Sequence, residues 1–143
     1  MTIQFQVTFD CLDPARLAEF WAAALGYQLD SSPPGFATWP EALAAWGVPE
    51  SEWNSASAVV DPSGAGPRVF FQRVPERRST KNRVHLDLRC SDVTAAPDVR
   101  REQALAAVPA LVELGATRSH EVESLGSFWI VMHDPEGNEF CVT

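Results

Sequence analysis

The chain has 143 residues, 45% of them hydrophobic and 21% charged, which fits a single globular domain whose core needs no disulfide. A formal net charge of −8 argues against nucleic acid and anionic membranes as partners, since both require a positive surface. No apolar run approaches the roughly 20 residues that span a bilayer, no signal peptide is visible, and three scattered cysteines fit reduced thiols, so we expect a cytoplasmic protein.

The chain opens with a pattern typical of a strand. Residues 3–9 alternate between apolar and polar side chains, which predicts a strand with Ile3, Phe5, Val7 and Phe9 on one side. Gln6 and Thr8 then lie on the other side of the strand, available to a binding site.

A helix is predicted next. Asp13 and Pro14 form a helix start, with the aspartate as N-cap and the proline at the first helical position. Apolar residues recur through 17–25 with helical spacing, and Gly26 supplies a helix end. Residues 27–29 begin the following strand.

Residues 31–55 break this regular pattern. The segment is rich in proline, serine and tryptophan, and predicts one short helix around 41–46 within an ordered loop. Trp39, Trp46 and Trp53 have two interpretations. They form a small separate core beneath the loop, or an aromatic lid over a cavity for a flat or hydrophobic molecule.

The remaining elements follow from similar patterns. Two strands, 57–60 and 68–74, are joined by a turn that begins at Asp61. A strand at 83–89 places Val84, Leu86 and Leu88 on one side and His85 with Asp87 on the other. A helix at 99–114 contains Pro109, which we expect to kink or restart it, and strands are predicted at 117–122, 128–132 and 140–142.

The second half of the chain repeats the first. Residues 6–13 and 85–92 are both short alternating strands that run into Cys-x-Asp. Each is followed by a helix ending in Leu-Gly, an Asp-Pro-x-Gly turn and a last strand. The repeat predicts an α+β fold in which two tandem βαβββ modules, 1–78 and 79–143, form one domain. The Trp-rich residues 31–55 are an insert in the first module, and the functional site is expected between the two copies.

Four stretches, 13–26, 81–88, 114–116 and 134–141, resemble the vicinal oxygen chelate superfamily, in particular its glyoxalase-like branch with the bleomycin-resistance-type proteins. The resemblance spans nearly the whole chain. It implies a cleft of the glyoxalase/bleomycin-resistance/dioxygenase type between two βαβββ modules, usually in a homodimer.

The resemblance also implies where metal ligands stand. Metal-dependent members take one ligand from the first strand and one from the last strand of each module; these positions are Gln6, Gln72, His85 and Cys141 here. Gln6 and His85 are the metal-ligand candidates, whereas Gln72 and Cys141 occupy positions where carboxylates are expected. Asp87 is the nearest replacement carboxylate. The sequence therefore gives no firm cofactor, and the alternative is a divalent ion such as Zn, Ni, Mn or Fe.

Three functions stay open. The favoured one is a small-molecule-binding cleft without a well-formed metal site, with the candidate ligand-binding residues Gln6, Thr8, Gln72, Asp87, Trp39, Trp46 and Trp53. The alternative is a metal-dependent lyase or isomerase in which His85 is the candidate base. The third is a partner-binding module whose basic stretch, 68–83, holds six of the eleven lysines and arginines. That stretch is either a solvated loop or an attractor for an anion.

Overall fold

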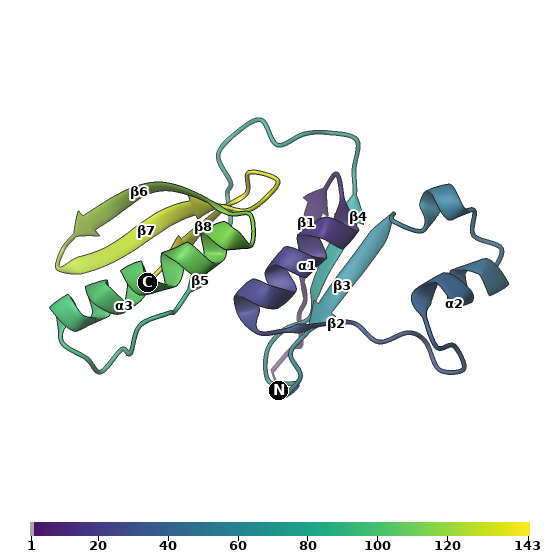
Figure 1. Cartoon of the computed structure of the whole chain (residues 1–143), viewed down its shortest axis with the longest axis horizontal. Helices are drawn as coiled ribbons and strands as arrows, with labels where there is room; N and C mark the ends of the chain where they lie inside the picture. Colours follow the sequence, from purple (N-terminus) through teal and green to yellow (C-terminus); the bar gives the residue numbers. More distant parts are fainter. Residues whose placement is uncertain (1) are drawn as a thin grey trace. The chain divides into compact units, whose positions relative to one another are not determined.

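The computed structural model describes residues 2–143 as two compact units, one ending at Arg77 and the other beginning at Arg78. Each unit is one βαβββ module with a four-stranded sheet, so the predicted α+β class is confirmed (Figure 1). None of the helices in the described part of the chain is long and apolar enough to cross a membrane.

The two modules share one topology. The first contains β1 (Val7–Cys11), α1 (Pro14–Leu25), β2 (Gln28–Leu29), β3 (Ala56–Val60) and β4 (Val69–Arg73), with α2 (Trp39–Ala45) and a 3-10 turn (Glu50–Glu52) between β2 and β3. The second contains β5 (Leu86–Leu88), α3 (Pro97–Glu113), β6 (Thr117–Ser124), β7 (Ser127–His133) and β8 (Glu139–Val142). The strand orders are β1-β4-β3-β2 and β5-β8-β7-β6, and the first pair in each is parallel.

Helix α1 begins and ends as its sequence predicts. The Asp13 carboxylate accepts a hydrogen bond from the backbone N–H of Arg16, and Pro14 occupies the first turn. Gly26 ends the helix with a φ of 68°, in the left-handed region that favours glycine.

The first core lies between α1 and its sheet. Leu17, Phe20 and Trp21 are buried on the sheet-facing side of α1. The Phe9 ring of β1 lies 5.2 Å from Trp21 and 5.5 Å from Phe71 of β4, measured between ring centroids. This aromatic cluster fixes one face of the sheet against the helix.

The second core is built in the same way from α3. Ala104, Val108 and Leu111 are buried on the helix, and Ile130, Met132, Phe140 and Val142 are buried on the strands. Pro109 lies inside the helix, which continues through it to Glu113, so the expected restart is wrong. In Figure 1 α3 runs along one face of its sheet, as α1 does in the first module.

Two predicted strands are too long at their starts. Ile3 and Phe5 are 87% and 71% exposed, and β1 begins only at Val7, because its pairing with β4 starts at the Val7–Val69 pair. Val84 is likewise 77% exposed, because β5 pairs with β8 only from Leu86 onward. The predicted starts of these two strands, at residues 3 and 83, are therefore wrong.

Candidate functional site

The second module carries a hollow on the face of its sheet opposite α3, here called its helix-free face. Side chains along a strand alternate between the two faces of the sheet. Phe140 and Val142 of β8 are buried on the helix side, so Cys141 between them points to the opposite face. The hollow has a volume of about 380 Å³. It is lined by Lys81, His85, Asp87, Trp129, Val131, Glu139, Cys141 and Thr143.

Three possible metal-binding side chains converge in this hollow. His85 Nε2 lies 3.4 Å from Asp87 Oδ1. One donor atom from each of His85, Asp87 and Cys141 falls within 4.8 Å of the other two. Strand pairing explains the convergence, because Asp87 of β5 lies directly opposite Cys141 of β8. The His85 and Asp87 side chains are 43% and 56% exposed, whereas Cys141 is buried.

The Cys141 thiol has an unusual electrostatic environment. Burial, reinforced by the neighbouring Asp87 carboxylate, raises the pKa of the Cys141 thiol to about 11. In the metal-free protein this group is therefore a thiol and not a nucleophilic thiolate at neutral pH. A bound cation would have to displace its proton.

Glu139 is a site residue that the sequence interpretation missed. It lies on β8 two residues before Cys141, and its carboxylate accepts a hydrogen bond from Lys81 Nζ at 2.7 Å. This bond and the Lys81 charge hold the pKa of Glu139 below its usual value. The period-two alternation of β8 would have placed Glu139 beside Cys141. The hollow thus contains two carboxylates, Asp87 and Glu139, and not Asp87 alone.

The first module places Gln6 on the corresponding face of its own sheet, but in a different environment. Arg68 Nη1 donates to Gln6 Oε1 at 3.1 Å, while Arg68 Nε and Nη2 both donate to Asp30 Oδ2. Gln6 Nε2 donates to Thr8 Oγ1 at 3.5 Å. The amide oxygen that would bind a metal is therefore already held by a guanidinium.

Gln72 is also engaged within the first module. Its Nε2 donates to Asp10 Oδ1 at 2.7 Å, and the strand register places these two residues opposite each other on β4 and β1. Asp10 was missed in the sequence, although it continues the alternation of Gln6 and Thr8. It gives this face a carboxylate that the family-based ligand positions do not include.

The Trp-rich insert forms a small aromatic cluster of its own. Trp46 packs edge-on against Phe36 and Trp39, with ring centroids 5.8 and 6.4 Å apart. Trp39 Nε1 donates to the backbone oxygen of Asp30, and Trp53 Nε1 donates to that of Val48. Trp39 and Trp46 stay exposed. Figure 1 shows α2 beyond the β2–β3 side of the first sheet, away from α1.

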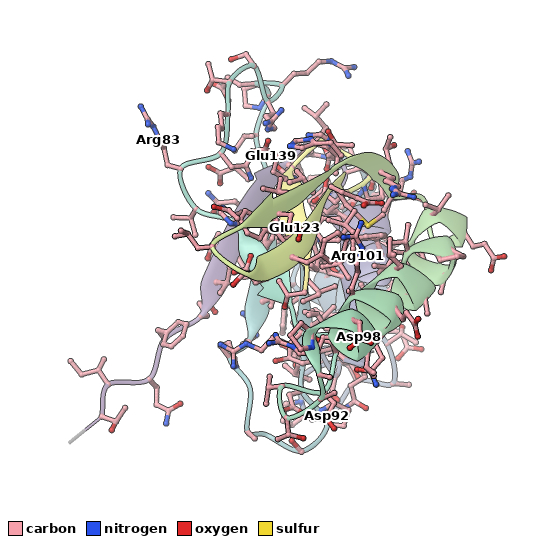
Figure 2. All side chains as sticks on the ribbon, turned by 90° about the vertical axis from the view of Figure 1, so that its left-hand side faces the viewer. Arg83, Asp92, Asp98, Arg101, Glu123 and Glu139 are labelled. Atoms are coloured by element: carbon pink, nitrogen blue, oxygen red, sulfur yellow. The ribbon has the colours of Figure 1, made fainter. Side chains whose placement is uncertain are left out.

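A second hollow, of about 500 Å³, lies between the start of α3 and the β6–β7 hairpin. Arg100 and Arg101 both line it. The Arg101 guanidinium forms ion pairs with Glu121 and Glu123 and lies over the Phe128 ring, while Arg100 Nε donates to Ser91 Oγ. Figure 2 shows Arg101 close to Glu123 between the helix and the hairpin. Because the Arg101 charge is already neutralised and both arginines have partners in the module, we favour the first hollow as the binding site.

Half of the cations in the basic stretch 68–83 are neutralised inside their own modules. Arg68, Arg73 and Lys81 form ion pairs with Asp30, Glu52 and Glu139. Arg83 extends away from the strands in Figure 2. Three of the six cations thus have acidic partners, which favours the structural interpretation of this stretch over an anion attractor.

Comparison with known families decides the classification. The model of the glyoxalase-like domain matches residues 6–143, which is nearly the whole chain. The chain belongs to the glyoxalase-like domain family. The resemblance to the vicinal oxygen chelate superfamily is thereby confirmed. No curated protein matches the sequence.

Solved structures support the fold of this glyoxalase-like protein. A glyoxalase/bleomycin resistance/dioxygenase family enzyme from Burkholderia phytofirmans PsJN is 15% identical, with a TM-score of 0.62 over 95% of this chain and 93% of that one. A fosfomycin resistance protein from Listeria monocytogenes, bound to Mn(II) and 1S,2S-dihydroxypropylphosphonic acid, is 11% identical, with a TM-score of 0.63 over 99% and 90%. A bleomycin-binding protein from Streptomyces verticillus, bound to copper(II)-bleomycin, is 16% identical, with a TM-score of 0.53 over 100% and 96%.

Proposed function

We propose that the helix-free face of the second module binds a small organic molecule in its 380 Å³ hollow. The volume falls within the roughly 300–1,000 Å³ of ordinary ligand pockets. Trp129 and Val131 supply apolar wall, while His85 and Asp87 supply polar groups that orient a ligand. This combination of an apolar wall with a few convergent polar groups is the observation that carries the proposal.

The ligands bound in two of the similar solved structures support the proposed class of ligand, a polar small molecule. The Streptomyces structure contains copper(II)-bleomycin, and the Listeria structure contains a dihydroxypropylphosphonic acid with Mn(II). Both ligands are polar small molecules. At these identities the similarity concerns the fold alone, so the two compounds serve here as probes.

The first module carries the remaining proposed ligand contacts on its own sheet and insert. Thr8 lies on β1 with Gln6 just before it, Gln72 lies on the adjacent β4, and Trp39, Trp46 and Trp53 lie in the insert. Arg68 and Asp10 hold the side-chain amides of Gln6 and Gln72 by hydrogen bonds. We therefore assign these two glutamines the role of hydrogen-bonding groups for a ligand and not that of metal ligands. The exposed rings of Trp39 and Trp46 are available for a lid.

Tryptophan fluorescence tests the proposal. We expect copper(II)-bleomycin or the phosphonate to change the emission of the full chain, with the change strongly reduced in Trp129→Phe. Trp21→Phe is the matched control, because the Trp21 ring is buried in the core of the first module. If neither compound binds, or if Trp129→Phe responds like the wild type, these ligand classes are wrong for this hollow.

A metal-dependent lyase or isomerase is the second candidate function. The convergence of His85, Asp87 and Cys141 favours it. In such an enzyme His85 is either a metal ligand or the base, but not both at once, because a ring nitrogen bound to a cation cannot accept a proton. Retained turnover in His85→Ala would contradict both roles.

A further inference from the structure

The second hollow, between the start of α3 and the β6–β7 hairpin, is larger than the first and is not used by the proposed function. Its volume of about 500 Å³ lies within the roughly 300–1,000 Å³ of ordinary ligand pockets. Pro97, Phe128 and Trp129 give it an apolar wall, and the hydroxyl groups of Ser91 and Ser127 add polar edges. The hollow therefore has the size and the mixed lining that suit an organic molecule.

Four charged side chains line the second hollow, and two of them neutralise each other. Arg101 forms an ion pair with Glu123 at 3.0 Å, and Figure 2 shows Asp98 on α3 apart from this pair. The other two, Arg100 and Asp98, form no ion pair with any residue in the described part of the chain. They do not pair with each other, because side chains two positions apart on a helix do not face each other. The hollow thus keeps one positive and one negative group without a charged partner.

The Arg100 guanidinium is held in place but keeps its charge. Its Nε donates to Ser91 Oγ at 3.4 Å, and the Ser91 backbone N–H donates to the carbonyl oxygen of Thr143. A hydroxyl is a neutral partner, so the two Nη groups remain able to bind a carboxylate through paired hydrogen bonds. Asp92 does not take this role, because its carboxylate already accepts hydrogen bonds from the Thr94 backbone and hydroxyl.

We propose that the second hollow binds a small zwitterionic molecule with an apolar body. Its carboxylate pairs with Arg100, its ammonium group pairs with Asp98, and its body packs on Phe128 and Trp129. A zwitterion has no net charge, so the formal charge of −8 on the chain does not oppose its approach as it would oppose that of an anion. Amino acids with an apolar side chain and aromatic acids that carry an aminomethyl group have this chemistry.

The second hollow can be tested separately from the first. Trp129 and Thr143 line both hollows, whereas Arg100 and Asp98 line only the second. Variants of Arg100 and Asp98 therefore leave the polar groups of the first hollow in place. A failure of the test below leaves the fluorescence test of the first hollow unaffected.

Isothermal titration calorimetry of the full chain tests the proposal with two zwitterions. L-phenylalanine carries its charges on adjacent atoms, and para-aminomethylbenzoic acid carries them at opposite ends of a ring. We expect one molecule of at least one of them to bind per chain. Affinity should fall at least about tenfold in Arg100→Gln and in Asp98→Asn, because each variant loses a charge-assisted hydrogen bond. Neither residue is buried, so both variants should fold.

Arg83→Gln is the matched control. It removes a positive charge from the same module outside the hollow, and Figure 2 shows Arg83 extending away from the strands. This variant should bind the zwitterion like the wild type. Absence of binding by both zwitterions, wild-type affinity in Arg100→Gln or in Asp98→Asn, or an equal loss in Arg83→Gln would each overturn the proposal.

Analogues without the ammonium group identify the contact with Asp98. Phenylpropionate is the analogue of L-phenylalanine, and para-toluate is that of para-aminomethylbenzoic acid. In the wild type the zwitterion should bind at least about tenfold more tightly than its analogue, and this advantage should disappear in Asp98→Asn. An advantage that persists in Asp98→Asn would show that Asp98 does not hold the ammonium group and would overturn the proposal.

Discussion

Cys141 should retain its proton well above neutral pH, because burial and the Asp87 carboxylate raise its pKa to about 11. We therefore expect slow alkylation by iodoacetamide near neutral pH and a steep increase as the pH approaches that value, measured by mass spectrometry of the metal-free protein. Rapid modification of Cys141 near neutral pH would contradict the burial of its sulfur.

The raised pKa of Cys141 also makes the free energy of unfolding depend on pH. An unfolded cysteine titrates near pH 8.5, whereas folded Cys141 titrates near 11, so the folded state holds more protons between these values. The contribution of Cys141 to the free energy of unfolding is thus fully present below about pH 8.5 and decreases as the pH rises toward 11. Denaturant unfolding should show a greater loss of stability over this range for the wild type than for Cys141→Ala.

Asp134 has a structural role in the turn between β7 and β8. This buried carboxylate accepts hydrogen bonds from the backbone N–H groups of Glu136 and Asn138 and from the Asn138 side chain. We expect Asp134→Ala to lower the free energy of unfolding by about 1–3 kcal/mol, because partly buried N–H donors are left without their acceptor. Asp61→Ala, in the corresponding exposed turn of the first module, should cost less in the same denaturant titration.

At the scale of the element, the start of α1 is tied to the insert. Asp13 Oδ1 caps the helix and accepts from Asn54 Nδ2 at 2.8 Å, while Asn54 Oδ1 accepts from the backbone of Ala15. Asp13→Ala should lower the free energy of unfolding by about 1 kcal/mol through loss of the cap.

Asn54→Ala separates the two roles of this contact. It keeps the cap but releases the insert, so we expect a smaller stability loss with faster hydrogen exchange in residues 50–55. Equal exchange in the wild type and in Asn54→Ala would show that the contact does not order the insert.

The ends of an element could be predicted where capping residues mark them, as in α1. They could not be predicted where no such residue is present, as at the start of β1. Asp13, Pro14 and Gly26 fixed α1 correctly, because each acts on the backbone locally. The early part of β1 was misassigned because alternation at Ile3 and Phe5 resembles a strand even where no partner strand lies opposite. A strand depends on its neighbour, and the length of that neighbour is not a local property.

The same distinction holds for the residues of the candidate site. Those found by local alternation could be predicted, and contacts that depend on strand pairing could not. The family resemblance implied His85 and Cys141, and strand alternation added Asp87. Glu139 was missed although the same alternation contains it. The engagement of Gln6 by Arg68 could not be predicted, since the two residues are 62 positions apart and their meeting depends on the strand register.

For the whole molecule, each module has its own core, with Phe71 buried in the first and Phe140 in the second. Replacing either phenylalanine by alanine should cost about 3–5 kcal/mol. We expect Phe140→Ala to accelerate amide exchange mainly in residues 78–143, and Phe71→Ala mainly in residues 1–77. Identical exchange patterns in the two variants would contradict independent cores.

The hollow on the helix-free face of the second module is the binding site that we propose. Amide NMR spectra of the full chain, recorded during titration with copper-free bleomycin and with the phosphonate, test it most directly. We expect shifts concentrated at residues 81–87, 129–131 and 139–143 for at least one probe. Shifts confined to residues 6–10 and 68–72 would contradict it, because they would place the site on the first module.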